Sequence, residues 1–464
     1  NYRPISLLQV SYKLFTKIIT NRLSVVANEY ILSSSQLGFR PGMSSQSALR
    51  AVVDIIEDAT RHDREIHIAY VDFKKAFDSV RHAALLETLA HYGLGENFVD
   101  LVRRLYDNCE SDIYLNSNPS EPFPIRRGVR QGDTLSPLLF ILTINPMLEW
   151  IRSGNEGYRF SNGLKVPTVT YCDDVALVGS KPEELESMTR RLVLFGAWAG
   201  LDMNPSKSAH TCARASRPAV LRVPDCADVS GSATIPSIPQ SACYRYMGVA
   251  LNLDLDWSSQ MTSTKNRVTK YLHLIVHRRI STENRIYISN MVLNAIVGYS
   301  MCVVQYPHTW LMGVQRSIIS ALKRSMRIPA NLDDEPFLMK TSEGGRGLTS
   351  LVDLQNATLC ACTVQEITSQ ALSAQTIDAT WNHAFAYDGS HVARWVEAIK
   401  GMGWQAWPKV GDLDWVGHFV ADPALAHALV NKGIFRWSHM MDSNRLKPAH
   451  LIIGVTGMGV TASE

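Results

Sequence analysis

The tetrapeptide Tyr171-Cys172-Asp173-Asp174 constrains this chain most, because it places two carboxylates side by side. A β-branched run at 166–170 precedes it and an apolar run at 175–179 follows it, which is typical of a two-strand hairpin with acid at its tip. Neighbouring like charges repel each other, and a hard divalent cation with oxygen ligands relieves that repulsion. The alternative is a solvated turn, since Asp favours turns.

A second candidate acid, Asp72, follows the apolar run Ile66–Val71. It therefore stands at the carboxyl end of a predicted strand, where α/β proteins tend to place ligands. Two acid-bearing strand ends that are far apart in the chain can meet across one sheet. Three carboxylates placed in this way can hold two Mg²⁺ ions for in-line attack on a phosphate. The spacing therefore favours metal-dependent phosphoryl transfer.

Three cationic segments suit such a site. Arg40, in the loop 36–42, either reaches a triphosphate or is a surface arginine. Residues 126–137 carry three arginines, two glycines and a glutamine ahead of an apolar helix at 138–150. This polar turn is either a platform for nucleotide and template or a capped loop. Lys207 precedes another predicted strand and is placed to project beside a phosphate.

Apolar spacing predicts several helices, and the runs between them predict strands and loops. Leu14, Ile18, Ile19 and Leu23 fit one helical face, and Ser44 or Ser45 can cap the helix that follows. The segment 214–240, rich in Ser, Pro, Ala and Val, is predicted to be a loop or a poorly ordered insertion. Further predicted helices lie at 82–92, 96–108 and 182–200, and a basic helical stretch lies at 259–330.

The composition is globular, with 464 residues, 46% hydrophobic residues, 19% charged residues and a net charge of +3. The eight cysteines have no Cys-x-x-Cys spacing with downstream histidines, so we expect reduced thiols in an intracellular protein, without a zinc module. The sequence contains no run of 18 apolar residues and no signal peptide, so we expect no membrane location. Because the chain opens at Asn1, we expect a fragment of a longer polypeptide.

Four motifs, in this order, resemble the reverse transcriptases of non-LTR (LINE-like) retrotransposons. They are the octapeptide 71–78, the turn 128–137, the tetrapeptide 171–174 and Tyr246-Met247-Gly248. Residues 1–8 and the loop 36–40 are similar to finger segments of that family. The resemblance is close over about residues 1–250, and the stretch to about 350 is similar to the thumb. The last hundred or so residues resemble nothing identified.

This resemblance implies an α+β right-hand polymerase. Fingers and palm, an antiparallel sheet backed by helices, would occupy 1–250. A helical thumb would occupy 251–350, and 351–464 would be a C-terminal helical segment of unknown role. The implied reaction is RNA-directed DNA synthesis with two Mg²⁺ ions, for which Mn²⁺ can substitute. The implied partners are an RNA template, a DNA primer and dNTPs.

The resemblance also implies roles by position. Asp72, Asp173 and Asp174 would hold metal, with the carbonyl of Phe73 facing metal or nucleotide. Lys207 would be the general acid that protonates pyrophosphate. The other implied contacts are Arg40 with the triphosphate, Gln131 and Gly132 with the incoming base pair, and Tyr246 and Gly248 with the primer end.

Phe77, five residues after Asp72, would select the sugar. A bulky ring beneath C2′ leaves no space for a 2′-hydroxyl, so deoxynucleotides are favoured. Cys172 replaces a commoner small residue, and it would sensitise the site to oxidation. The alternatives are an intron-maturase-type reverse transcriptase, an RNA replicase, and an inactive or domesticated RNA-binding relic.

Overall fold

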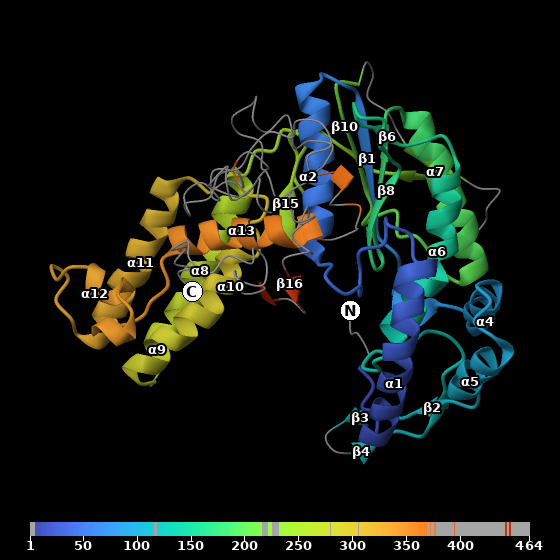
Figure 1. Ribbon diagram of the computed structural model, residues 1–464, viewed down its shortest axis with the longest axis horizontal. Coiled ribbons are helices and arrows are strands. Elements are labelled where there is room, and N and C mark those ends of the chain that lie inside the picture. The colour runs from blue at the N-terminus through green and yellow to red at the C-terminus, as the bar shows by residue number, and fades with distance from the viewer. Residues whose placement is uncertain are drawn as a thin grey trace, which may run out of the picture. The chain divides into compact units, whose positions relative to one another are not determined.

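The computed structural model (Figure 1) describes residues 5–115, 118–215, 221–224, 232–278, 280–304 and 306–368, with short pieces at 372, 375–376, 394, 441–442 and 445–446. The chain divides into two compact units. The first comprises residues 1–247 with 252–254, and the second comprises 248–251 with 255–464. This division lies close to the boundary predicted at 250. Most of the predicted C-terminal helical segment lies outside the described residues.

A five-stranded sheet forms the centre of the first unit, in the order β13-β10-β1-β9-β8. Strand β1 pairs antiparallel with both β9 and β10, and β8 pairs antiparallel with β9, so the predicted strand before Asp72 and the predicted acidic hairpin are confirmed. The strands are β1 (Ile66–Val71), β8 (Thr168–Tyr171), β9 (Asp174–Gly179), β10 (Ala209–Ala213) and β13 (Ser237–Ile238).

Helices cover both faces of this sheet (Figure 1), which makes the unit α+β as predicted. Helix α2 (Ser45–Arg61) lies on one face, and α6 (Ser136–Ser153) and α7 (Pro182–Ala199) lie on the other. Buried side chains of β1, β9, α6 and α7 join one apolar cluster. Helices α4 (His82–His91) and α5 (Glu96–Tyr106) pack against each other, and α4 also packs against α6.

Local signals explain where these helices begin and end. The Ser44 hydroxyl accepts a hydrogen bond from the Ser47 amide at 3.3 Å, and the Ser47 side chain accepts one from the Ser44 amide in return. This reciprocal cap confirms the predicted start of α2. Pro182 opens α7, and Gly200, with φ of 85°, ends it in a left-handed conformation.

Helix α1 (Val10–Val26) is confirmed, but only part of its predicted apolar face, Ile19 and Leu23, packs against the core. Leu14 and Ile18 are 64% and 48% exposed, whereas Thr16 and Leu23 are buried. The Thr16 hydroxyl lies 3.0 Å from that of Thr134, so the helix docks through a polar contact that the apolar spacing did not indicate. The helix continues into a π-helical turn, η1 (Ala27–Ile31).

The predicted loop at 214–240 contains strands, so that prediction is wrong for its described part. Strand β11 (Leu221–Pro224) pairs antiparallel with β12 (Ser232–Ile235), and β13 joins the central sheet parallel to β10. Leu221 and Val223 are buried while Arg222 between them is exposed, and β11 packs on α7. A four-residue strand ending in proline is too short for its alternation to stand out in a Ser/Pro-rich background. Residues 216–220 and 225–231 lie outside the described part.

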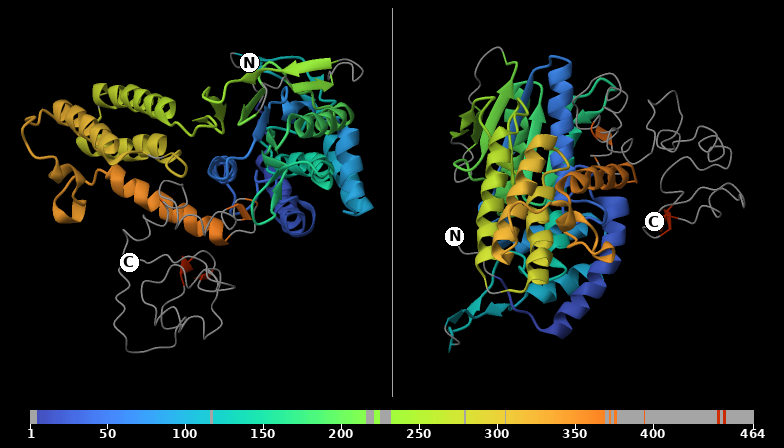
Figure 2. Two further views of the ribbon diagram at one scale, coloured as in Figure 1. Left: turned by 90° about the horizontal axis from the view of Figure 1, so that it is seen from above. Right: turned by 90° about the vertical axis from the view of Figure 1, so that its left-hand side faces the viewer.

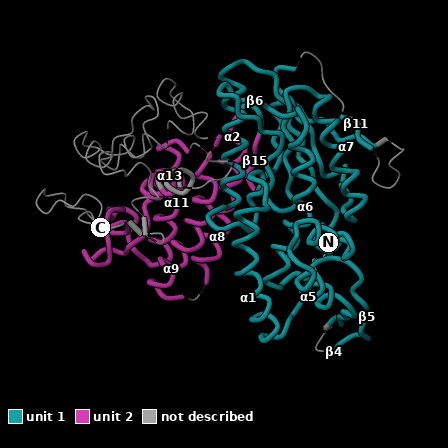
Figure 3. The backbone as a smooth tube through the Cα atoms, turned by 45° about the vertical axis from the view of Figure 1, so that its right-hand side comes forward, with its two compact units in different colours: residues 1–247, 252–254 teal, residues 248–251, 255–464 magenta. Residues whose placement is uncertain are grey.

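Most of the described residues between 258 and 326 in the second unit are helical, which confirms the helical stretch predicted at 259–330. Helices α8 (Ser258–His277) and α11 (His308–Met326) run side by side (Figure 2), and the unit is coloured separately in Figure 3. Its other elements are α9 (Thr282–Ile288), η2 (Ser289–Leu293), α10 (Asn294–Gly298), α12 (Glu335–Leu338), η3 (Thr341–Glu343), α13 (Leu351–Thr368), β15 (Val249–Leu251) and the pair β16 (Met441–Asp442) and β17 (Arg445–Leu446).

The first unit has further short elements. They are α3 (Ala76–Ser79), β2 (Glu110–Ser111), β3 (Tyr114–Leu115), β4 (Asn118–Pro119), β5 (Phe123–Pro124), β6 (Tyr158–Arg159), β7 (Lys165–Val166) and β14 (Tyr244–Tyr246). Across the described residues of both units, every helix is too short or too polar to cross a membrane.

Candidate active site

The register of the central sheet brings the three predicted acids together. Strand β1 pairs with β9 as far as Val71 and Val175, and Asp72 and Asp174 are the next residues along the two chains. Cys172 and Asp173 form the turn between β8 and β9. All three aspartates line one cavity of about 1180 Å³.

The loop between α7 and β10 fixes Asp72. The side-chain amide of Asn204 donates to Asp72 Oδ2 at 3.3 Å, and its backbone amide donates to the Asp72 carbonyl at 2.7 Å. The Asp72 amide donates to the hydroxyl of Ser208 at 3.1 Å. Lys207 Nζ lies 4.0 Å from Asp72 Oδ2 and lines the same cavity. The structure therefore places Lys207 beside the acids, where the sequence predicted a phosphate neighbour.

Tyr244, in β14, is a member of this neighbourhood that the sequence did not single out. Its hydroxyl donates to the Lys207 carbonyl at 3.1 Å, and its ring stacks on Tyr70 of β1 at 4.4 Å between centroids. Burial and, to a smaller degree, the charges of Asp72 and Asp174 raise the pKa of Tyr244 to about 12. Tyr244 therefore remains a neutral hydrogen-bond donor at physiological pH.

The predicted primer-end residues lie elsewhere. Tyr246 is buried against Tyr70, with ring centroids 5.1 Å apart, and it does not line the cavity of the aspartates. Met247 and Gly248 both have positive φ, at 47° and 80°, which confirms the tight turn predicted there. Gly248 belongs to the second unit. Their contact with a primer stays a prediction.

Gln36 lies in the loop 36–42, called the finger loop below, and holds the turn at 171–174, called the acidic turn, through hydrogen bonds. Its Oε1 accepts hydrogen bonds from the amides of Gly38 at 2.8 Å and Cys172 at 2.9 Å. The same segment extends the sheet beyond β8, because Thr170 accepts from Leu37 at 2.8 Å and donates to the Ser35 carbonyl at 2.9 Å. Gln36 is fully buried. It is therefore a positioning residue for Asp173 and Asp174, and sequence spacing carried no signal for it.

Gly38 allows this close approach. A Cβ atom on Gly38 would lie 2.3 Å from the sulfur of Cys172 and 2.5 Å from its amide nitrogen. Cys172 itself adopts a positive φ of 58° at the tip of the hairpin. The finger loop and the acidic turn are thus packed backbone against backbone, and only glycine fits between them.

We expect Gln36→Leu to slow primer extension by roughly tenfold and to lower the free energy of unfolding by about 1–3 kcal/mol, because it leaves buried amides without their acceptor. Single-turnover extension and urea denaturation measure the two effects. Gln9→Leu, at an exposed glutamine before α1, is the matched control and should change neither. Equal effects of the two substitutions would contradict the positioning role.

The structure corrects the expectation that Cys172 sensitises the site to oxidation. Cys172 is buried, and burial, followed by the charges of Asp173 and Asp174, raises the pKa of its thiol above the ordinary range. Oxidation and alkylation require the thiolate. Cys172 is therefore kept in its unreactive form, although it touches the acidic turn.

Phe77 lines the cavity and is held by two other rings. Its ring stacks on Phe140 of α6 at 4.1 Å with an interplanar angle of 17°, and Phe39 meets it edge-on at 6.2 Å. Phe73 lines the cavity as well. The stack fixes the orientation of the Phe77 ring, which a steric selection of the sugar requires.

Gln131 and Gly132 also line this cavity. The side chain of Gln131 donates to Asp78 Oδ1 at 2.9 Å, and its carbonyl accepts from the Ser6 amide at 2.8 Å. Gly132 has φ of 114°, and a Cβ there would lie 2.6 Å from the Ser6 carbonyl oxygen. The segment around Ser6 therefore sets the backbone of this loop, and glycine is required at 132.

The guanidinium of Arg130, in the turn 126–137, is held by several contacts. It lies over the rings of Tyr12, at 5.1 Å, and Tyr106, at 5.6 Å, and donates to the Leu105 carbonyl at 2.8 Å. Arg127 and Arg130 both line the cavity of the aspartates. The polar turn therefore faces the candidate site, as the platform interpretation requires.

Arg40 does not line that cavity. Its guanidinium donates to the Asn28 side chain at 2.9 Å and to the carbonyls of Ser33 at 2.9 Å and Gln36 at 3.2 Å. Burial lowers its pKa from the ordinary arginine value. Arg40 braces the loop that carries Gln36, and a contact with triphosphate stays a prediction.

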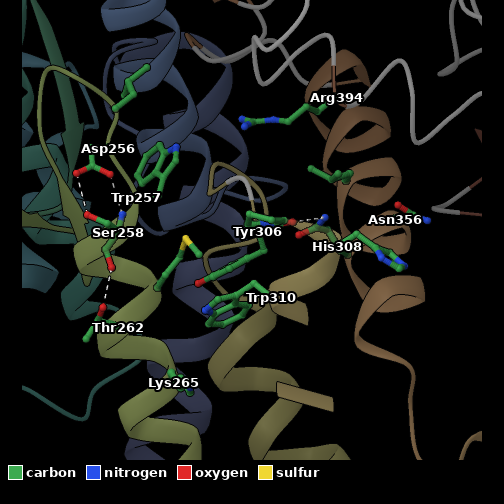
Figure 4. A pocket seen from close by; sticks show the side chains of 15 residues that line it. Asp256, Trp257, Ser258, Thr262, Lys265, Tyr306, His308, Trp310, Asn356 and Arg394 are labelled. Carbon is green, nitrogen blue, oxygen red and sulfur yellow. Dashed lines mark hydrogen bonds between the residues drawn. The ribbon is translucent and has the colours of Figure 1, made fainter. Parts of the chain in front are cut away.

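The second unit contains a separate cavity of about 900 Å³ (Figure 4). The rings of Trp257, Tyr306 and Trp310 line it together with Lys265. Among the described residues that line it, the one carboxylate is that of Asp256, which accepts hydrogen bonds from the Ser258 amide at 3.0 Å and hydroxyl at 2.8 Å, and these bonds lower its pKa. A single engaged carboxylate does not make a two-metal site, so we assign the candidate chemistry to the cavity of the first unit.

Basic side chains of the second unit are not all available to a phosphate backbone. Lys323 of α11 is buried and pairs with Asp334 Oδ1 at 2.6 Å. Lys265, Arg267 and Lys270 of α8 are exposed. Lys323 therefore forms an ion pair within the protein, whereas other basic side chains of this stretch are exposed to solvent.

The match to a known protein family covers nearly all of the first unit. The family model described as reverse transcriptase (RNA-dependent DNA polymerase) matches residues 1–251. The Pol polyprotein of the retrotransposable element R2DM from Drosophila melanogaster is 28% identical over 250 residues, covering 54% of this chain and 23% of that protein. A probable RNA-directed DNA polymerase from transposon BS of Drosophila melanogaster is 26% identical over 345 residues, covering 71% and 35%. This chain thus spans a minor part of both relatives.

Among solved structures, apo telomerase from Candida tropicalis shows a weak likeness, with a TM-score of 0.38 and 10% identity, covering 80% of this chain and 61% of that one. The family match is the stronger finding, because it covers more than half of the chain and includes every aspartate of the candidate site. The chain therefore belongs to the reverse transcriptase (RNA-dependent DNA polymerase) family, and its relatives are the reverse transcriptases of non-LTR retrotransposons.

Proposed function

We propose that this chain adds dNTPs to the 3′-hydroxyl of a DNA primer on an RNA template and releases pyrophosphate. The observation that carries the proposal is the meeting of Asp72, Asp173 and Asp174 on one cavity, with Lys207 Nζ 4.0 Å from Asp72 Oδ2. The family match and the relatives named as RNA-directed DNA polymerases support it. The protein of which this chain forms part is proposed to be a retrotransposon polyprotein.

The donor set at this cavity suits magnesium. It consists of the carboxylates of Asp72, Asp173 and Asp174 with the backbone carbonyl of Phe73, and hard oxygen ligands favour Mg²⁺, with Mn²⁺ as a substitute. Two bound ions would neutralise charge on the phosphates and lower the pKa of the primer hydroxyl. A bound cation would offset the repulsion among the three carboxylates that line this cavity.

Other side chains of this site select the sugar, contact the base pair and donate a proton. The Phe77 ring, fixed by Phe140, excludes a 2′-hydroxyl. Gln131, oriented by Asp78, and Gly132 lie beneath the incoming base pair. Lys207 gives a proton to the leaving pyrophosphate.

Primer extension by the purified chain tests the proposal. We expect a DNA primer annealed to RNA to be extended when dNTPs and Mg²⁺ are supplied, to stop growing when EDTA removes the metal, and to grow again when Mg²⁺ or Mn²⁺ is restored. Absence of extension on any primed RNA would favour the alternative of an inactive RNA-binding relic.

Sugar selection has a sharper test. We expect Phe77→Val to reduce the preference for dNTPs over rNTPs by roughly 5- to 150-fold, since relief of an overpacked contact is worth about 1–3 kcal/mol. The ratio of kcat/KM for dGTP and GTP on one template measures this. Phe123→Val, at an exposed phenylalanine of β5 that does not line the cavity, should leave the ratio unchanged. A wild-type preference for rNTPs would instead favour the RNA replicase.

A further inference from the structure

Two neighbouring strands of the central sheet carry a second group of metal-binding side chains. His67 of β1 and His210 and Cys212 of β10 place their ligand atoms within 4.8 Å of one another. The register sets His67 opposite Cys212 and Ala69 opposite His210, so all three side chains share one face of the sheet. His67 and His210 are 143 residues apart, which is why Cys/His spacing along the chain could not reveal them.

The carboxylate of Glu65 determines which ring nitrogen of His67 carries the proton. Glu65 Oε1 lies 2.8 Å from His67 Nε2, and His67 Nδ1 lies 3.2 Å from His210 Nε2. Because a carboxylate only accepts hydrogen bonds, His67 Nε2 carries the proton and Nδ1 presents its lone pair to the cluster. This is the tautomer that a metal requires, and a carboxylate behind a ligating histidine is its usual support.

We propose that His67, His210 and Cys212 bind one Zn²⁺ ion, with solvent at the fourth position and Glu65 fixing the His67 ring. Two nitrogens on a tetrahedral zinc stand about 3.3 Å apart, given bonds of roughly 2.0–2.1 Å, and the two histidine nitrogens are 3.2 Å apart. The two rings are nearly parallel, with an interplanar angle of 3°, so both must turn for their lone pairs to converge on the ion. Imidazole and thiolate ligands select zinc over the Mg²⁺ that suits Asp72.

Zinc binding here has a defined proton balance. The thiol of Cys212 loses its proton to solvent, and the proton on His210 Nε2 moves to Nδ1 of the same ring, so one proton is released for each ion bound. His67 lies five residues before Asp72, which is about 16 Å along an extended strand. The ion would therefore tie β1 to β10, the two strands next to Asp72 and Lys207, without entering the reaction.

The test uses the whole chain, stripped with a chelator and titrated with Zn²⁺ or Co²⁺. We expect about one zinc per chain at this site and, with Co²⁺, the visible and near-ultraviolet absorption of a cobalt thiolate. Cys212→Ser should abolish the thiolate band, and both it and His210→Gln should weaken metal binding by at least ~10-fold. Cys243→Ser, at an exposed cysteine outside the group, is the matched control and should retain both.

The readouts separate this site from the polymerase site. Asp173→Ala should bind zinc as the wild type does, whatever its activity. Zinc should raise the thermal unfolding temperature of the wild type and of Cys243→Ser, but not that of Cys212→Ser, which also shows whether that variant folds. If the stripped chain takes up no zinc, or if Cys212→Ser binds Co²⁺ with wild-type affinity and spectrum, the group is a hydrogen-bonded network and the proposal fails.

Discussion

Asp72→Asn is expected to slow primer extension by about 10³-fold or more while the protein keeps its fold. Asparagine has nearly the same size as aspartate, and its oxygen can still accept the 3.3 Å hydrogen bond from Asn204. The substitution removes only the negative charge, and charge stabilisation by a bound metal is worth several kcal/mol, with each ~1.4 kcal/mol corresponding to tenfold in rate. The single-turnover rate at saturating dNTP measures the loss.

Asp202→Asn is the matched control for this experiment. Asp202 lines the same cavity, but it is exposed, lies in the loop between α7 and β10, and is not one of the three proposed metal ligands. We expect it to change the rate by less than about threefold, because an exposed charge in high dielectric contributes little. Both variants should show wild-type urea denaturation. A rate loss of similar size in the two would mean that the cavity needs net negative charge rather than a carboxylate at Asp72.

The parts of the site that the sequence predicted correctly are those set by local signals. The run ending at Val71 and the hairpin around Cys172 are confirmed, because alternation and turn residues act within a few residues of each other. The start of α2 is confirmed as well, since a cap needs only Ser44 and Ser47. The motif order then indicated that the acids converge, and the β1–β9 register shows how.

The contacts that the sequence did not reveal depend on pairing between distant segments. Gln36 reaches the acidic turn because its backbone forms a β-bridge with Thr170. His67 lies opposite Cys212 only because β1 pairs with β10. A buried glutamine and an isolated histidine look like ordinary residues until their neighbours are known. Helix α1 is the converse case, since Leu14 and Ile18 have the spacing of a buried face but are exposed, and the helix docks through Thr16 as well as Leu23.

Lys207→Arg is expected to lower kcat by roughly 10²- to 10⁴-fold, the range typical of a lost general acid. Arginine keeps the positive charge near Asp72 Oδ2 but does not release its proton in proteins. The KM for dNTP should therefore change little, whereas Lys207→Met, which also removes the charge, should raise KM as well. Steady-state extension at varied dNTP separates the two effects.

The protein should tolerate these changes, because Lys207 is 58% exposed and a surface ion pair at 4.0 Å adds little stability. Lys181→Arg, at an exposed lysine before α7 that does not line the cavity, should keep wild-type kcat and KM. If Lys207→Arg also keeps wild-type kcat, Lys207 acts only as a charge, and the proton for pyrophosphate comes from solvent. A loss confined to kcat in the arginine variant would identify proton donation, because charge and position are both retained.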